Sequence, residues 1–285
     1  MKKPNFRRIL RPLAGVLLAL SLAVPGGIAP AALAAEEAVA VQDLYGVRVD
    51  GVPMSANPCV TDVNSVCYVS LRAVVQAVLP QAQVTWSCGT AAVSLPGVLS
   101  LTATVGQTYL VANGRYLYVP AGVLLRNGTV LVPLSPLLKA LDAKGSWQAD
   151  GSLDIATGSG GILPAEQFYN ESDLYWLSRI ICAESGNQPL LGKIAVGNVV
   201  LNRVRDPRFP NTIYNVIYQK NQFSPAASGS VKRAPNAESV LAAKLCLDGA
   251  VALANVLYFN QVGLNCWAYR NRPFVQTIAG HSFYA

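Results

Sequence analysis

An internal repeat in the first half of this 285-residue chain constrains the fold more than any other feature of the sequence. The segments 49–51, 68–73 and 84–86 recur at 112–114, 131–136 and 145–147, at offsets of 63, 63 and 61 residues. Each copy predicts a hairpin around an Asp-Gly or Asn-Gly turn, a strand, a short helix and a closing hairpin that carries a Trp. The predicted helices span 71–79 and 134–141. Two such half-cores would pack into one β-rich domain.

The repeat resembles the copper amine oxidase-like N-terminal domain of bacterial surface proteins over about residues 42–156. The name does not imply copper, because the sequence offers no cluster of histidines to bind it. The resemblance implies a spacer or a wall-binding module. The matched residues Trp86 and Trp147 could be sugar platforms, but their equivalent positions in the two repeats favour core aromatics.

The first 34 residues have the three parts of a secretory signal peptide: five basic residues within the first eleven, an apolar run from Leu13 to Val24, and small residues that end at Ala34. The apolar run is shorter than the roughly 20 residues of a membrane-spanning helix, and a retained N-terminal anchor is the alternative. Cleavage would leave 17 basic and 15 acidic residues, so the net charge of +7 says nothing about the partner of the mature chain. We expect no nucleic-acid partner. We expect a secreted monomer without membrane contact.

Six cysteines in an exported chain predict disulfides, and Cys59 with Cys67 is the first candidate among the fifteen possible pairings. Their spacing does not match a zinc site, and the chain contains a single histidine, His281. We therefore expect neither a metal nor another cofactor.

A Gly-rich segment at 157–163 separates the repeat from a second pattern. The composition, with 52% hydrophobic and 13% charged residues, excludes a disordered chain or a coiled coil. The predicted organisation is a signal peptide at 1–34, the repeat domain at 36–156, a linker at 157–167 and a second domain at 168–285.

The second domain carries the candidate chemistry. Asn170 or Ser172 can cap a helix that Gly186 can end. Glu184 follows Leu177 by seven residues and Ile180 by four, so the helical period places its carboxylate on the buried face. Burial raises the pKa of a carboxyl group, as a general acid near neutral pH requires. The alternative is that the helix has already frayed and Glu184 points into water.

The rest of this domain reads as helices, turns and two strands. The apolar helix 194–204 carries Asn198 and Asn202 one turn apart, where we expect them to hold neighbouring backbone. Residues 208–211 predict a turn and 221–225 a strand or loop, whereas Asn236 can cap a helix over 238–248. Strands are expected at 256–260 and 277–284.

The order of motifs resembles the SleB/CwlJ-type cell wall hydrolases, the spore cortex-lytic enzyme family, over about residues 172–285. The matching pieces are Arg179 with Ala183-Glu184, AVGNVVLNRV, 205–212, Gln222-Phe223-Ser224, Tyr258-Phe259-Asn260 and 278–284. The resemblance implies a mostly helical, lysozyme-like domain with a small β-sheet that cleaves peptidoglycan glycan strands in the cell wall or spore envelope. It places the catalytic acid on Glu184. The expected fold class of the whole chain is therefore α+β, with a β-rich two-repeat domain first.

The sequence departs from the family after this glutamate. Ser185-Gly186-Asn187-Gln188 replaces the usual Ala-Arg-Gly-Glu and removes a second acid. Hydrolases of sugars usually need two carboxylates, and no other acid of this half forms a motif opposite Glu184. A lytic transglycosylase needs one, because the substrate's own C6 hydroxyl attacks C1. We favour such cleavage of the MurNAc-GlcNAc β-1,4 bond over a muramidase-type hydrolase of vegetative wall, or a non-catalytic wall-binding protein.

The remaining site candidates come from the matched motifs. Gln222 and Ser224 could hydrogen-bond N-acetyl groups or hydroxyls, and Phe223 and Tyr258 could pack on sugar faces. Asn260 and His281 are substrate-binding candidates by their place in the motifs, with a structural role as the alternative for His281. Cys182 with His281 as base would make a cysteine hydrolase, for which no orienting Asn or Asp motif is present.

Overall fold

The computed structural model describes residues 46–285 apart from 57, 59 and 60. The expected signal peptide and Cys59 lie outside the described residues. Within the described part, Cys88, Cys182, Cys246 and Cys266 form no disulfide with one another. No helix in this part is both long and apolar enough to cross a bilayer. Two hydrophobic cores form, one in the repeat and one among the helices of the second half, and the predicted α+β class is confirmed.

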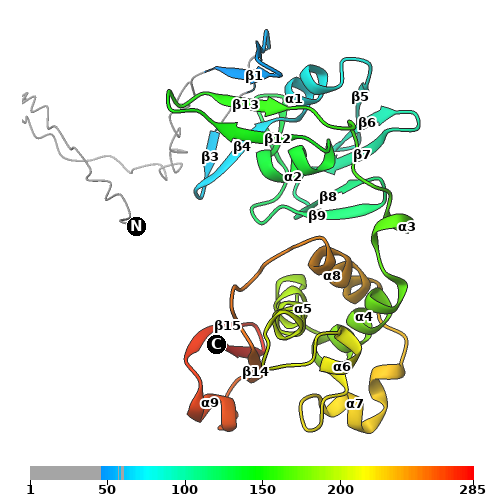
Figure 1. Ribbon diagram of the computed structural model, residues 1–285, viewed down its shortest axis with the longest axis vertical. Coiled ribbons are helices and arrows are strands. Elements are labelled where there is room, and N and C mark those ends of the chain that lie inside the picture. Colours follow the sequence, from blue (N-terminus) through cyan, green and yellow to red (C-terminus); the bar gives the residue numbers. More distant parts are fainter. Residues whose placement is uncertain (1–45, 57, 59–60) are drawn as a thin grey trace, which may run out of the picture. The chain divides into compact units, whose positions relative to one another are not determined.

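The repeat region is built from short strands and two helices (Figure 1). Its elements are β1 (Val47–Val49), β2 (Val52–Pro53), β3 (Thr61–Val63), β4 (Val66–Ser70), α1 (Leu71–Val78), β5 (Gln83–Ser87), β6 (Thr90–Leu95), β7 (Leu99–Thr104), β8 (Tyr109–Ala112), β9 (Arg115–Tyr118), β10 (Leu124–Arg126), β11 (Thr129–Pro133), α2 (Leu134–Ala140), β12 (Lys144–Trp147) and β13 (Leu153–Ala156).

Local chemistry explains why the repeat folds as predicted. Asn113 and Gly114 connect β8 to β9 with φ values of 48° and 76°, the positive angles that a tight hairpin turn requires. Ser70 caps α1 by accepting a hydrogen bond from the Ala73 amide at 3.3 Å. The hairpins and both helices are thereby confirmed.

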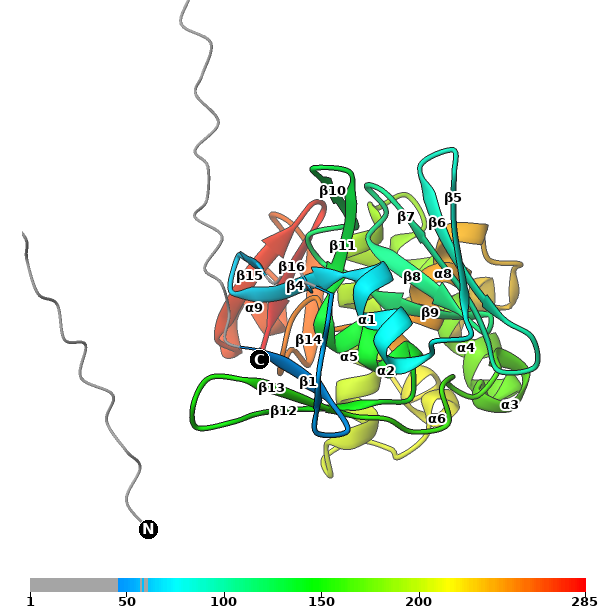
Figure 2. The same cartoon turned by 90° about the horizontal axis from the view of Figure 1, so that it is seen from above.

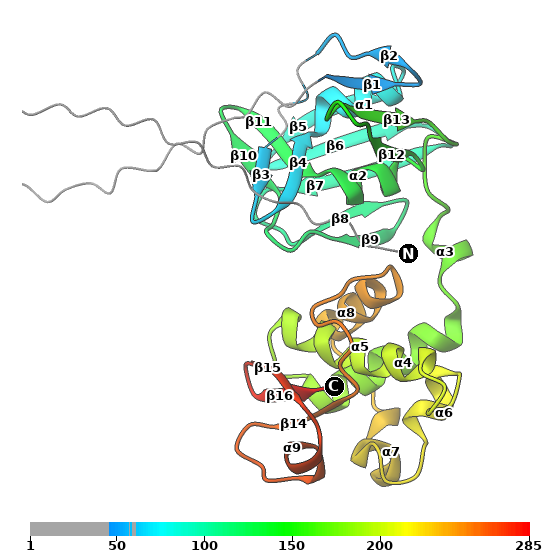
Figure 3. The same ribbon diagram turned by 60° about the vertical axis from the view of Figure 1, so that its left-hand side comes forward.

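The two repeats meet through equivalent strands. β4 and β11 pair antiparallel, with Val69 opposite Val132 and Tyr68 opposite Pro133. Val69 and Val132 are equivalent by the 63-residue offset, so each repeat presents the same strand to the other. The hairpin of β5 and β6 continues through β7 to β8 and β9 in one sheet (Figure 3), and β12 and β13 join β1 and β2 in another (Figure 2). Each sheet therefore combines strands of both repeats over one core.

The interpretation of Trp86 and Trp147 as core aromatics is wrong. Their exposed fractions are 47% and 52%. Both lie on the outermost strand of their sheet, β5 and β12 respectively. Equivalent positions in a repeat share an environment, but the sequence does not say whether that environment is the core or the solvent.

The second half is mostly helical, with one small sheet in the order β14-β16-β15. Its elements are α3 (Ala165–Phe168), α4 (Glu171–Ser185), α5 (Leu190–Arg205), α6 (Ile213–Ile217), α7 (Ser224–Ser228), the 3-10 helix η1 (Ser230–Lys232), α8 (Ala237–Leu247), β14 (Tyr258–Gln261), α9 (Trp267–Asn271), β15 (Phe274–Ile278) and β16 (His281–Tyr284). Asn170 caps α4 and Asn236 caps α8 through their side-chain oxygens, as expected.

Two predicted elements of this half differ. Residues 221–225 were expected to be a strand or a loop. Residues 221–222 form a turn, in line with the loop alternative, but this turn leads into α7 at Ser224. The strand predicted over 277–284 is a hairpin: β15 ends at Ile278 and β16 starts at His281. Ala279 makes this turn with φ of 48°. A positive φ is uncommon for alanine, so the sequence did not predict the turn.

The apolar helix α5 lies in the second core, and its two asparagines hold the segment before β14. Asn198 donates to the Ala250 carbonyl and accepts from the Ala252 amide, both at 2.8 Å. Asn202 donates to the Val256 carbonyl at 3.0 Å. The predicted structural role of both amides is confirmed, and they fix the approach to β14 beside the site.

Candidate active site

Glu184 lines a cavity of about 820 Å³ at the end of α4. The helix continues to Ser185, so it has not frayed before the glutamate. Burial of the carboxyl group raises its pKa to about 7. The side chain is therefore partly protonated at neutral pH, which is the state that a general acid needs.

The cavity is formed by segments that lie far apart in the sequence: α4, the last turn of α5, the connection from α6 to α7, β14 and the start of β16. Among the described residues that line it, Glu184 is the only acid. The other lining residues are Arg203, Tyr218, Gln219, Lys220, Asn221, Gln222, Phe223, Ser224, Ala226, Ala227, Phe259, Asn260, Gln261, Leu264 and His281.

The fold brings together most of the residues predicted from motifs. Gln222, Phe223, Ser224, Asn260 and His281 all line the cavity with Glu184. Phe223 also belongs to the core and is only 5% exposed, so its ring forms a wall of the cavity.

Tyr258 does not line this cavity. Its ring packs against Phe209 and Trp267, with centroid separations of 6.2 and 5.5 Å. Its expected contact with a sugar face is therefore not supported by its position.

Asn260 and His281 each present a buried atom without a hydrogen-bond partner in the described part of the chain, Oδ1 and Nδ1 respectively. The Asn260 Nδ2 group donates to the carbonyls of Gln261 and Leu264, at 2.8 and 3.2 Å, so its Oδ1 is left as an acceptor. Burial lowers the pKa of His281, which keeps the imidazole neutral at neutral pH. Both side chains suit an uncharged, polar ligand.

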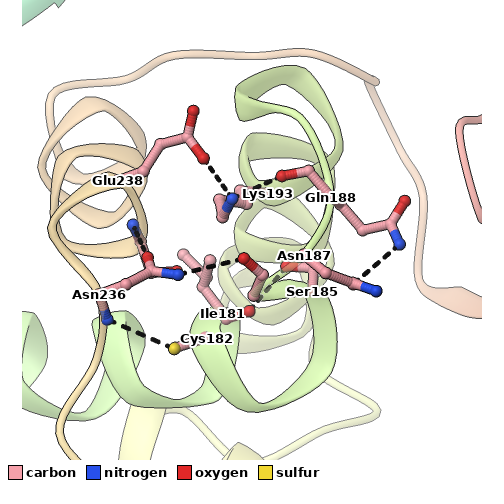
Figure 4. A network of polar contacts seen from close by, with 10 residues as sticks. Ile181, Cys182, Ser185, Asn187, Gln188, Lys193, Asn236 and Glu238 are labelled. Carbon is pink, nitrogen blue, oxygen red and sulfur yellow. Dashed lines mark hydrogen bonds and ion pairs between the residues drawn. The ribbon is translucent and has the colours of Figure 1, made fainter.

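A polar network fixes the turn that follows Glu184 (Figure 4). The Lys193 ammonium is buried between the Gln188 carbonyl, at 2.5 Å, and the Glu238 carboxylate. Asn236 donates to the Gly186 carbonyl at 3.1 Å. These contacts tie the end of α4 to α5 and α8, so the segment that replaces the usual Ala-Arg-Gly-Glu is held from both sides.

The same network directs Cys182 away from the cavity. Its Sγ atom accepts from the Asn236 amide at 3.5 Å (Figure 4), and Cys182 does not line the cavity that holds His281. The geometry of a Cys-His nucleophile is therefore missing.

Arg203 and Gln219 are the lining residues that sequence reasoning missed and that carry polar groups without partners. Arg203 stands inside the AVGNVVLNRV motif, where an arginine within an otherwise apolar helix was the available indication. Gln219 lies in the connection after α6 and gave no comparable indication.

Comparison with known proteins identifies the family of the chain. The family model described as cell wall hydrolase matches residues 187–284, and that of the copper amine oxidase N-terminal domain matches 48–153. The cell wall hydrolase CwlJ of Bacillus subtilis is 32% identical over 122 residues, which cover 40% of this chain and 84% of that protein. The chain belongs to the cell wall hydrolase family. Both resemblances inferred from the motifs are thereby confirmed.

Other curated relatives of this chain match over a smaller share of their own length. The spore cortex-lytic enzyme of Bacillus cereus is 32% identical over 117 residues, 40% of this chain and 45% of that enzyme. That of Oceanobacillus iheyensis is 29% identical over 150 residues, 49% of this chain and 54% of the relative. The chain thus spans about half the length of these curated relatives.

A solved structure also matches: the catalytic domain of the germination-specific lytic transglycosylase SleB from Bacillus anthracis, with 29% identity and a TM-score of 0.40. The match covers 43% of this chain and all of that domain. The family-model match starts three residues after Glu184. The family-model match therefore does not include Glu184.

Proposed function

We propose that this cell wall hydrolase is a peptidoglycan lytic transglycosylase that cuts the MurNAc-GlcNAc β-1,4 bond with Glu184. The observation that carries the proposal is a single carboxyl group, with its pKa raised to about 7, among the described lining residues of the cavity. The names of the relatives, spore cortex-lytic enzymes and a lytic transglycosylase, support the substrate class.

One carboxyl group can complete this reaction. Protonated Glu184 gives its proton to the bridging oxygen as the glycosidic bond breaks. The resulting carboxylate then removes the proton of the C6 hydroxyl as that oxygen bonds to C1. The product is a 1,6-anhydro end, no water is consumed, and Glu184 returns to its protonated state. A hydrolase would need a second carboxylate to activate water.

The other lining residues would hold the glycan. Gln222, Ser224, Asn260 and His281 offer polar groups for hydroxyls and N-acetyl groups, and Phe223 offers an apolar wall. The partner is then a glycan strand of peptidoglycan, in the cell wall or the spore envelope.

Mass spectrometry of the soluble products tests the proposal. Purified vegetative and cortex peptidoglycan would each be incubated with the chain, with Glu184→Gln, and with Glu171→Gln as an exposed control in the first turn of the same helix. We expect anhydromuramic ends from the unaltered chain and the control alone. Reducing muramic ends would show that the chain hydrolyses the bond instead of forming an anhydro product. An active Glu184→Gln variant would show that Glu184 is not the catalytic acid.

We also propose that the repeat domain binds the wall rather than acting only as a spacer. The exposure of Trp86 and Trp147 at equivalent positions favours binding, because exposed aromatic rings on strands are suitable platforms for sugar rings.

A further inference from the structure

Unpartnered polar atoms concentrate at the Glu184 cavity. Within the described residues, eight buried side-chain nitrogen or oxygen atoms lack a hydrogen-bond partner, and four of them belong to residues that line this cavity. The four are Arg203 Nη1, Gln219 Oε1, Asn260 Oδ1 and His281 Nδ1. Because a buried polar group without a partner is unfavourable, such a concentration indicates a site that a polar ligand completes.

Arg203 is the least expected of these residues. It lies in the last turn of α5, is 4% exposed, and forms no ion pair with a carboxylate in the described part of the chain. Its Nε donates to the Leu257 carbonyl at 2.7 Å. The rings of Phe209, Phe223 and Tyr258 surround the guanidinium at 5.0, 5.2 and 5.3 Å.

These contacts orient the guanidinium and leave its buried Nη1 without a hydrogen-bond partner. The aromatic rings favour the positive charge, and the carbonyl fixes one edge of the planar group. Burial of an arginine without a counter-ion is unfavourable in free energy, so its hydrogen bond to Leu257 does not by itself explain why Arg203 is buried here. The unused Nη1 can only donate, and it requires an acceptor oxygen from a ligand.

We propose that Arg203 is a substrate-binding residue whose Nη1 donates to the carbonyl oxygen of an acetamido group on the bound amino sugar. Asn260 Oδ1, in the same cavity, supplies an acceptor for an acetamido N–H. A secondary amide is the ligand group that offers both a carbonyl acceptor and a single N–H donor. The inference rests on the proposed function and names the sugar substituent that the site reads.

Binding measurements on the Glu184→Gln chain test this assignment, because the glycan is then not cleaved. The probes are the tetrasaccharide of two GlcNAc-MurNAc units and its N-deacetylated form, titrated by calorimetry. Arg203→Lys in this background should weaken binding of the acetylated probe by roughly 10- to 100-fold, the usual effect of a charge-assisted hydrogen bond. Removal of the acetyl groups from the probe should lower its affinity for the Glu184→Gln chain by a similar factor. The same removal should hardly change its affinity for the chain that also carries Arg203→Lys.

Arg205→Lys is the matched control, since Arg205 is exposed and lies two residues further along the same helix. Equal losses on deacetylation with and without Arg203→Lys would overturn the inference, because two groups that touch each other cannot contribute independently.

A crystal structure of the Glu184→Gln chain with the acetylated probe covers the case in which Arg203→Lys does not fold. We expect Nη1 within about 3.2 Å of an acetamido oxygen. An acetamido group bound elsewhere overturns the inference. Cleavage by the unaltered chain separates the two proposals. If the chain neither cleaves nor binds the glycan, the proposed function is overturned. If the chain cleaves it and Arg203→Lys leaves the affinity unchanged, this inference alone is overturned.

Discussion

At the scale of single residues, the proposed role of Glu184 predicts how activity depends on pH. The carboxyl group must be protonated to act as the acid, and burial raises its pKa to about 7. We therefore expect kcat to fall as pH rises through 7, by about tenfold per unit above that value. Initial rates of anhydromuramic product release between pH 5 and pH 9 would check this. A profile that stays level through pH 8 would contradict the assignment.

The same pKa shift predicts a stability change for Glu184→Gln. The folded pKa lies above the unfolded value of 4.5, so the stabilising contribution is complete below pH 4.5 and is lost as pH rises through 7. Glutamine carries no charge to bury. The unfolding free energy of the variant, relative to that of the unaltered chain, should therefore be higher at pH 8 than at pH 4 by about 2 kcal/mol. Urea unfolding at both pH values measures this, and a pH-independent difference would refute it.

Sequence reasoning identified Glu184 because helical spacing puts an acid on an apolar stripe, a conflict visible without coordinates. It missed Arg203 because a cation in the last turn of a helix is also what the helix dipole favours. Only the folded chain shows that Arg203 is buried among three rings with an unused nitrogen. The contact of Tyr258 with a sugar face stays a prediction, because a matched motif does not say which of its residues line a cavity.

At the scale of elements, the ion pair of Lys193 and Glu238 joins α5 to α8. The Lys193 side chain is 2% exposed and that of Glu238 is 50% exposed, so the two partners are not equivalent. Glu238→Ala leaves a buried ammonium without its carboxylate and should cost about 2–4 kcal/mol of unfolding free energy. Lys193→Met leaves an exposed carboxylate in water and should cost less.

Denaturant unfolding of both variants and of the double variant checks this asymmetry. Lys193→Met should recover part of the stability lost in Glu238→Ala, since it removes the unpaired charge. If Lys193→Met proves the more damaging single change, the buried cation is not the source of the cost.

The Gly-rich segment shows where element prediction from sequence stops. The segment is predicted to be a linker, and it also packs closely: a Cβ atom at Gly158 or Gly161 would approach the carbonyl oxygens of Asp142 or Val98 to 2.0 or 2.2 Å. These glycines permit close packing against the repeat rather than freedom of the chain. Helix caps and Asn-Gly turns were predictable because their chemistry is local, whereas close approach depends on distant residues.

At the scale of the whole molecule, the internal repeat predicts a test of wall binding. Trp86 and Trp147 occupy equivalent places, and each borders a hollow that also contains the first residue of the neighbouring helix, Leu71 or Leu134. Two equivalent sites on one chain would bind a repetitive polymer with avidity. In the Glu184→Gln background, each Trp→Ala change should weaken cosedimentation with peptidoglycan several-fold, and the double change by the product of both or more.

The folded state should hardly respond to these changes, because both rings are about half exposed, and each should alter the unfolding free energy by no more than about 1 kcal/mol. Leu125→Ala is the matched control, since Leu125 is 48% exposed in the same domain and is not part of either hollow. Loss of sedimentation in the Trp variants at unchanged stability would establish binding by the repeat. Full sedimentation of the double variant would leave the repeat as a spacer, with wall contact made by the catalytic cavity.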